Sequence, residues 1–185
     1  MKSRALLIVA LEQELPTTGL ADWTILYTGV GKVNAAINLM AALTETKPDL
    51  LINYGTAGAN KTGLTHIVEI GQSVQCDMDA RPLGIALGAT PFETGTECFT
   101  LSASPIICGT ADSFVTIAPE LACDLVDMEL YALAKIARRQ QTPLKSFKFI
   151  SDNADDNSQQ DWKNSLPDAA SGFLCIQDYL LSLLG

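Results

Sequence analysis

The sequence predicts an α/β fold, a three-layer αβα sandwich in which helices cover both faces of a central, mostly parallel mixed sheet. Short, largely apolar segments of strand length recur along the chain, as at residues 5–10 (ALLIVA) and 50–54 (LLINY). Such segments are typical of strands that are buried on both faces. Between them lie segments whose apolar residues are three or four positions apart, which forms one face of a helix. Strands interleaved with helices indicate a largely parallel sheet.

Length and composition predict one domain spanning residues 1–185. The chain is 48% hydrophobic, which is enough to bury a core. We find no internal repeat, low-complexity tract or linker that would divide it. No segment approaches the roughly 18 apolar residues that cross a bilayer. The apolar run at 5–11 is shorter than a signal peptide requires and is followed at once by Glu12 and Glu14.

Charge and cysteine content argue against several classes of function. The formal net charge is −9, whereas binding to nucleic acid or to an anionic membrane needs a basic surface. The five cysteines are an odd number without a C-x-x-C pair, and the sequence has one histidine. This pattern excludes zinc-site spacing and predicts no metal. It favours reduced thiols in a cytoplasmic protein over a disulfide framework.

The first third of the chain is expected to form three strands and one helix. The strands are apolar runs that end in acidic, glycine or proline residues, at 5–10, 23–27 and 50–54. Residues 32–46 have apolar side chains at helical spacing and stop before Pro48. The glycine-rich segment 55–59 is expected to be a turn.

The middle of the chain has a weaker pattern. Residues 67–75 resemble a strand interrupted by Gly71, and 85–87 is a further candidate strand. Elsewhere between 77 and 105 no period is sustained, so the structure there is left open. Residues 105–109 are again expected to be a strand.

The C-terminal part returns to a clear alternation. A short segment at 125–129 leads into a helix at about 129–141, with two arginines near its C-terminus that suit the helix dipole. Residues 147–151 form an apolar strand, and 169–184 are expected to close the chain as an amphipathic helix.

The strand at 147–151 delivers Asp152 to its C-terminal end. Ligands bind at that edge in open α/β sheets, so a carboxylate there is a candidate catalytic group. Lys148 shares a face with Asp152 if the strand stays extended, and a cation inside such a strand requires a partner. The alternative is that Asp152 caps the helix that follows.

Three acids follow separate strands or begin helices: Glu14, Glu129 and Asp152. Each alone has a structural explanation, such as a helix N-terminus for Glu129 or solvation for Glu14. Together at one edge of a sheet they would form a site in which one carboxylate acts as a base and another as an acid. The segment 29–34 (GVGKVN) lacks the third glycine of a dinucleotide fingerprint and the Ser or Thr of a P-loop, which favours a simple turn.

Five segments, taken in order, resemble the purine nucleoside phosphorylase and 5′-methylthioadenosine/S-adenosylhomocysteine nucleosidase family. They are residues 10–14 (ALEQE), 28–36 (TGVGKVNAA), 52–58 (INYGTAG), 126–129 (VDME) and 150–155 (ISDNAD). The resemblance implies an enzyme that breaks the N-glycosidic bond of a purine nucleoside or thionucleoside without a metal or organic cofactor. It also implies a homodimer.

The same resemblance implies roles for individual residues. Glu14 matches the base that polarises the attacking water, Asp152 the acid that protonates the purine at N7, and Glu129 the acid that binds the ribose hydroxyls. The other substrate-binding positions are Thr56 in the glycine-rich turn, Phe114 and Val115 at the base, Met128 at the sugar, and Lys148 in place of an arginine near the water. Cleavage passes through an oxocarbenium-like sugar, so the site must protonate the purine and supply a nucleophile.

The nucleophile separates a hydrolase from a phosphorylase. The bacterial phosphorylases that this chain resembles bind phosphate with arginines, one of them just ahead of the glycine-rich turn, whereas this chain has Asn53 there. Water is therefore the expected nucleophile, and a phosphate-dependent phosphorylase is the alternative. The cations that favour the alternative are Lys32, Lys61 and Lys148. A catalytically idle member that binds a purine is a third hypothesis.

The chain also departs from the family pattern. It is shorter than typical members at 16–23 and at 93–106, segments that usually shape the base and 5′ pockets. The base and the 5′ substituent therefore stay open. Trp162 is expected either to cap the purine or to pack under the last helix.

Overall fold

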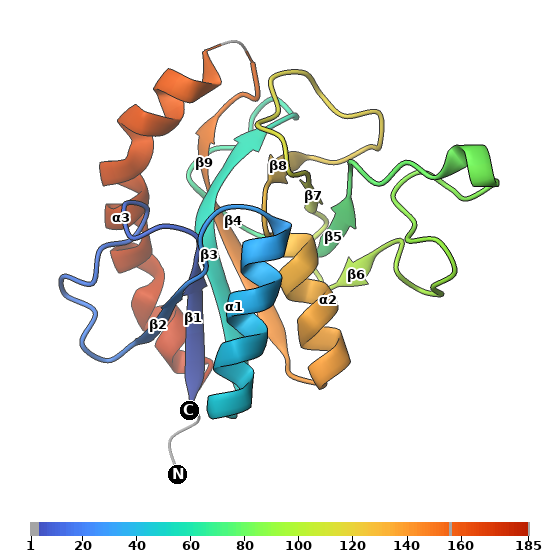
Figure 1. The fold of residues 1–185 in the computed structure, drawn as a ribbon. Helices are drawn as coiled ribbons and strands as arrows, with labels where there is room; N and C mark the ends of the chain where they lie inside the picture. Colours follow the sequence, from blue (N-terminus) through green and yellow to red (C-terminus); the bar gives the residue numbers. More distant parts are fainter. Residues whose placement is uncertain (1–3, 156, 185) are drawn as a thin grey trace.

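The computed structural model describes residues 4–155 and 157–184 (Figure 1). Residues 1–3, Asp156 and Gly185 lie outside the described part. The helices and strands are β1 (Ala5–Val9), β2 (Thr24–Tyr27), α1 (Lys32–Glu45), β3 (Leu50–Ala59), β4 (Ile67–Glu69), β5 (Gln72–Gln75), a 3-10 turn (Arg81–Leu83), β6 (Phe99–Thr100), β7 (Ile107–Thr110), β8 (Leu125–Asp127), α2 (Leu130–Gln140), β9 (Leu144–Asp152) and α3 (Ser158–Ser182).

All strands of the described part belong to one mixed sheet, in the order β2-β1-β3-β8-β7-β5-β6, with β9 paired to β3 and β4. Five of its neighbour pairs are parallel: β1 with β2, β1 with β3, β3 with β9, β5 with β7, and β7 with β8. The pairs β3 with β8, β4 with β9 and β5 with β6 are antiparallel. The expected mostly parallel mixed sheet is confirmed.

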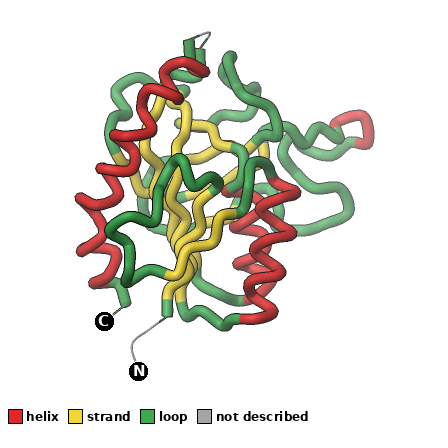
Figure 2. The backbone as a smooth tube through the Cα atoms, turned by 60° about the vertical axis from the view of Figure 1, so that its left-hand side comes forward, coloured by secondary structure: helices red, strands yellow, loops and turns green. Residues whose placement is uncertain are grey.

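Helices cover both faces of this sheet, as expected for an αβα sandwich. Figure 2 shows the strands between α3 on one side and the pair α1 and α2 on the other. The residues of β1 alternate between the two layers: Leu6 and Ile8 pack in the cluster with α1 and α2, and Leu7 and Val9 in the cluster with α3. This alternation follows from the two-residue period of a strand.

Strand β3 is longer than expected, and the predicted turn at 55–59 is wrong. The strand runs through Gly55 and Gly58 to Ala59. It pairs with β9 along one edge, and along the other edge with β1 as far as Asn53 and with β8 from Gly58 onward. Pairing with strands distant in sequence outweighs the local preference of glycine for turns.

Strand β9 contains a bulge just before its end. Ala57 pairs with Ile150, but the next residue of β3, Gly58, pairs with Asp152, so Ser151 is an extra residue. A bulge of this kind interrupts the two-residue alternation of side chains. The expectation that Lys148 and Asp152 share a face is therefore wrong.

Three further expectations need correction. Helix α3 begins at Ser158 rather than at 169 and contains Pro167. Its N-cap position is Asn157, so Asp152 does not cap it. Residues 85–87 are not a strand, and strand β6 was not expected from the sequence.

None of the described helices is long and apolar enough to cross a membrane.

Candidate active site

A cavity of about 180 Å³ opens at the C-terminal ends of β1, β3 and β8. At this point β3 has left β1 and has not yet met β8, so a short stretch of its edge has no neighbouring strand. The walls include six residues for which the sequence predicted roles: Glu14, Thr56, Phe114, Val115, Met128 and Glu129. The cavity therefore lies where the sheet splits.

Glu14 fills the gap in the edge of β3. Its Oε1 accepts the backbone N–H of Thr56 at 2.9 Å and the Thr56 hydroxyl at 2.6 Å. Its Oε2 accepts the backbone N–H of Leu11 at 3.2 Å. The side chain is buried. The carboxylate thus satisfies a strand N–H that β1 leaves free, and three donors hold it at the cavity wall.

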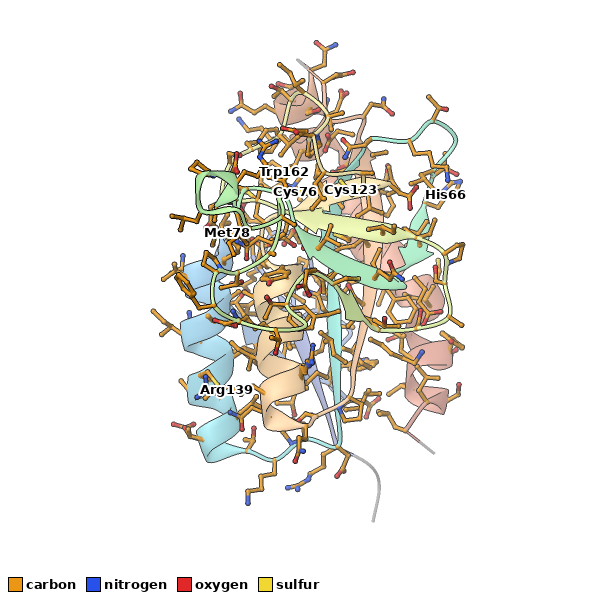
Figure 3. All side chains as sticks on the ribbon, turned by 90° about the vertical axis from the view of Figure 1, so that its right-hand side faces the viewer. His66, Cys76, Met78, Cys123, Arg139 and Trp162 are labelled. Atoms are coloured by element: carbon orange, nitrogen blue, oxygen red, sulfur yellow. The ribbon has the colours of Figure 1, made fainter. Side chains whose placement is uncertain are left out.

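Trp162, labelled in Figure 3, comes from the N-terminal part of α3. It lines the same cavity. Its indole N–H donates to Thr56 Oγ1 at 2.9 Å. Thr56 therefore connects Trp162 to Glu14. The sequence left open whether this tryptophan lies in the site or under the last helix, and the structure places it at the cavity wall.

Glu129 lies between β8 and α2, at the N-cap of the helix. It is buried, and its Oε1 accepts the backbone N–H of Gly31 at 2.9 Å. Burial, and then the charge of Asp127, raise the pKa of Glu129 to about 8, against the opposing effects of Lys148 and the Gly31 N–H. This carboxyl group therefore changes charge near neutral pH.

Asp127 is a residue of the site to which the sequence analysis assigned no role. Its Oδ2 receives Lys148 Nζ at 2.8 Å and the backbone N–H of Leu130 at 2.9 Å, and its Oδ1 accepts the Thr110 hydroxyl at 2.6 Å. Both charged side chains are buried. The expected need of Lys148 for a partner is confirmed, and that need was the signal in the sequence that could have identified Asp127.

Phe114 and Val115 lie on the loop that follows β7, and this loop is fixed to the start of α1. Asp112 accepts the backbone N–H of Lys32 at 2.7 Å, and Asp77 accepts the backbone N–H of Asp112 at 2.8 Å. Lys32 Nζ lies 2.5 Å from the Asp77 carboxylate. Phe114 is about half exposed, at 48%.

Asp152 and Lys148 do not line the cavity in the described part of the chain. Lys148 is directed to Asp127. The bulge turns Asp152 to Gly58, and its carboxylate accepts the Ser151 hydroxyl at 2.7 Å and the Ala154 N–H at 2.8 Å. Of the three acids, Glu14 and Glu129 line the same cavity, whereas Asp152 is not among the described residues of its wall.

Comparison with known proteins identifies the family of the chain. A family model described as the phosphorylase superfamily matches residues 15–91. The 5′-methylthioadenosine/S-adenosylhomocysteine nucleosidase of Actinobacillus succinogenes is 31% identical over an alignment of 172 residues that covers 79% of this chain and 74% of the relative. The chain belongs to the purine nucleoside phosphorylase and 5′-methylthioadenosine/S-adenosylhomocysteine nucleosidase family. The nucleosidase of a Marinomonas strain is 29% identical over an alignment of 188 positions that covers 86% of this chain and 80% of the relative.

Solved structures of this family share the fold. A Helicobacter pylori nucleosidase variant with 5′-methylthioadenosine in its active site aligns with a TM-score of 0.88 at 17% identity, covering 100% of both chains. The Colwellia psychrerythraea nucleosidase in complex with adenine aligns with a TM-score of 0.87 at 21% identity, covering 100% of this chain and 96% of that one. At these identities the alignment establishes the αβα architecture.

Proposed function

We propose that this chain is a nucleosidase that hydrolyses the N-glycosidic bond of a purine nucleoside or thionucleoside. The observation that carries the proposal is the cavity at the split in the sheet, with Glu14 and Glu129 in its wall. The relatives named above are 5′-methylthioadenosine/S-adenosylhomocysteine nucleosidases, which supports a thionucleoside of that type.

In this proposal Glu14 is the base that polarises the attacking water. Its Oε1 is occupied by two donors from Thr56, whereas Oε2 has one hydrogen bond among the described residues, to Leu11. A carboxylate oxygen can accept more than one donor. Oε2 is therefore the oxygen that would accept a proton from water as the water attacks C1′.

Glu129 and Met128 would hold the sugar. Glu129 is buried at the cavity wall, with one hydrogen bond from Gly31 to Oε1, so Oε2 would accept a ribose hydroxyl. Because its pKa is raised to about 8, Glu129 is mostly protonated near neutral pH, and its Oε2 can then donate to the ribose as well as accept from it. Phe114 would stack on the base and Val115 would offer main-chain contacts, since both belong to the same wall.

Asp152 would protonate the purine at N7. Its carboxylate is buried one residue beyond the bulge and is held by Ser151 and Ala154. In the proposal this side chain turns past Gly58 to the cavity when the base is bound. The absence of a side chain at Gly58 leaves room for this carboxylate, because a Cβ there would be 2.7 Å from Asp152 Oδ1.

The lysines support water over phosphate as the nucleophile. Each of the three candidate cations already has a carboxylate partner: Lys32 with Asp77, Lys61 with Asp124, and Lys148 with Asp127. The described cavity walls contain no arginine or lysine. A phosphate dianion needs several fixed cations, so a phosphorylase remains the less favoured alternative.

The deciding experiment is an assay for free base with purified protein and a panel of purine nucleosides, including 5′-methylthioadenosine, in buffer without phosphate. We expect base release. Release that requires phosphate would replace the hydrolase with the phosphorylase.

Substitution of the two acids tests the proposed chemistry. Glu14→Gln and Asp152→Asn are expected to reduce kcat by about 10²- to 10⁴-fold, the range for loss of general acid or base catalysis. Circular dichroism serves as the control for folding. If wild-type protein binds nucleosides without turnover, the chain is an idle purine-binding member instead.

We further propose that the chain forms a homodimer in the cytoplasm. Val30, Val33 and Ile37 form an exposed apolar stripe at the start of α1. Val30 also lines the cavity, so a second copy on this stripe would lie next to the site. The five free thiols support the location.

A further inference from the structure

We propose that Trp162 is a positioning residue for Glu14 and acts through the hydroxyl group of Thr56. The indole N–H donates to Thr56 Oγ1 at 2.9 Å, and Thr56 Oγ1 donates to Glu14 Oε1 at 2.6 Å. The inference rests on the proposed function, because it assumes that Glu14 acts on the attacking water.

The chemistry of the groups sets the direction of this relay. An indole N–H can only donate, so the Thr56 oxygen must accept from Trp162. A hydroxyl group has a single hydrogen, and the short contact to Glu14 uses it. A hydroxyl that accepts a hydrogen bond donates more strongly to the next group. Trp162 thus strengthens the hydrogen bond that Thr56 makes to the carboxylate.

The relay also restricts the rotation of Thr56. A threonine side chain has three staggered χ1 positions, and both partners of Oγ1 favour the one observed. If the indole N–H is removed, the hydroxyl loses one of these partners and can turn away from Glu14. Oε1 would then keep the backbone N–H of Thr56 but lose the shorter of its two contacts.

Three different parts of the fold hold the carboxylate through this arrangement. Leu11 follows β1, Thr56 lies in β3, and Trp162 belongs to α3 in the outer layer. Small displacements of a catalytic group lower the rate steeply because the reacting atoms must be aligned. We therefore expect the loss of the indole N–H to lower kcat more than it raises KM.

The variant Trp162→Phe tests this because it keeps an aromatic ring in the cavity wall and removes the N–H. We expect kcat to fall by about two- to tenfold, as for loss of one neutral hydrogen bond, with KM changed by less than about twofold. Thr56→Val should lower kcat more, since it removes the hydroxyl itself. Thr56→Ser keeps the hydroxyl group and should therefore retain most of the wild-type kcat.

A double-mutant cycle separates the relay from simple packing. In the Thr56→Val background, Trp162→Phe should have no further effect on kcat, because the relay is already absent. An equal decrease in both backgrounds would show that Trp162 acts by packing, and an unchanged kcat for Trp162→Phe in wild-type protein would show that it has no positioning role. Either result overturns the inference.

Nuclear magnetic resonance of the indole N–H groups tests the contact without relying on activity. The chain has two tryptophans, and the indole nitrogen of Trp23 is buried with no hydrogen-bond partner in the described residues. Thr56→Val should shift the Trp162 signal and leave that of Trp23 in place. An unshifted Trp162 signal overturns the inference. If wild-type protein releases no base from any nucleoside, the proposed function fails, whereas a shifted signal would still establish the contact.

Discussion

Glu129 is a buried carboxyl group of the site whose charged form is disfavoured. It is buried beside Asp127, and its pKa is raised to about 8, by burial first and by that neighbouring charge second. In the unfolded chain its pKa is the ordinary 4.5. Between these two pH values the folded protein keeps a proton that the unfolded chain has lost. The free energy of unfolding therefore decreases as the pH rises through this window, and this group adds no further change above about pH 8.

The substitution Glu129→Gln removes this titration and predicts a pH-dependent gain in stability. The amide can still accept the Gly31 N–H. We expect the Tm of the variant relative to wild type to be higher at pH 8.5 than at pH 5, measured by calorimetry. Glu45→Gln, at an exposed position of α1, is the matched control and should show no such difference. A Tm change of equal size at both pH values would contradict the prediction.

The residues of the site differ in how far the sequence could identify them. Glu14, Thr56 and Glu129 belong to segments with recognisable local patterns, and all three line the cavity. Asp127 could have been inferred from the buried cation alone. The contact of Trp162 with Thr56 spans 106 positions, and no local pattern indicates which buried donor meets which acceptor.

Strands β8 and β9 are linked through a buried ion pair. Lys148 of β9 and Asp127 of β8 are both buried, with 2.8 Å between Nζ and Oδ2. The two strands are not neighbours in the sheet, since both pair with β3. Burial alone would lower the pKa of Lys148, but the charge of Asp127 raises it above its ordinary value. The pair therefore joins opposite edges of β3 beside the cavity.

Removing one member of this pair should destabilise the protein strongly. We expect Lys148→Met to lower the free energy of unfolding by about 3–5 kcal/mol, because it leaves a buried carboxylate without its cation. Urea denaturation provides the measurement. The double variant Asp127→Asn with Lys148→Met should recover much of the loss, since no uncompensated charge remains.

Lys145→Met on the same strand is the matched control. Lys145 pairs with Glu69 at 2.8 Å, but both side chains are about 30% exposed. Pairs in contact with solvent contribute about 0–1 kcal/mol. Equal decreases in the free energy of unfolding for Lys145→Met and Lys148→Met would contradict the prediction. They would show that burial does not increase the contribution of the Lys148–Asp127 pair to stability.

Some helices and strands follow the pattern of their own sequence, whereas others are determined by pairing with distant strands. The extent of α1 and the starts of β1 and α2 match the apolar periodicity to within about a residue. The glycine-rich end of β3 does not, because its strand conformation depends on β8 and β9. The bulge in β9 likewise arises from register with β3, which the sequence of β9 alone does not contain.

On the surface of the molecule, helix α1 leaves an apolar stripe uncovered. Val33 and Ile37 of α1 are 66% and 61% exposed, and they are one helical turn apart. In contrast, α3 on the other side of the sheet packs Phe173 and Leu180 into the core. The uncovered stripe adjoins the cavity through Val30.

The proposed homodimer predicts that charge on this stripe yields a monomer. We expect wild-type protein to have the mass of a dimer in light scattering coupled to size-exclusion chromatography. Val33→Asp with Ile37→Asp should give the monomer mass with an unchanged circular dichroism spectrum, because both side chains are exposed in the single chain. Leu174→Asp on the exposed face of α3 should leave the dimer intact. A wild-type monomer at micromolar concentration would refute the proposal.

By itself the sequence determined the class of the fold and the acids that stand at strand ends, because burial period and chain order are local properties. The split of β3 between β1 and β8 was decided only by the tertiary structure, as were the place of Glu14 in that split and the relay from Trp162. These features depend on pairing between segments far apart in the chain, where each hydrogen bond forms only after the whole sheet has set the positions of its donor and acceptor.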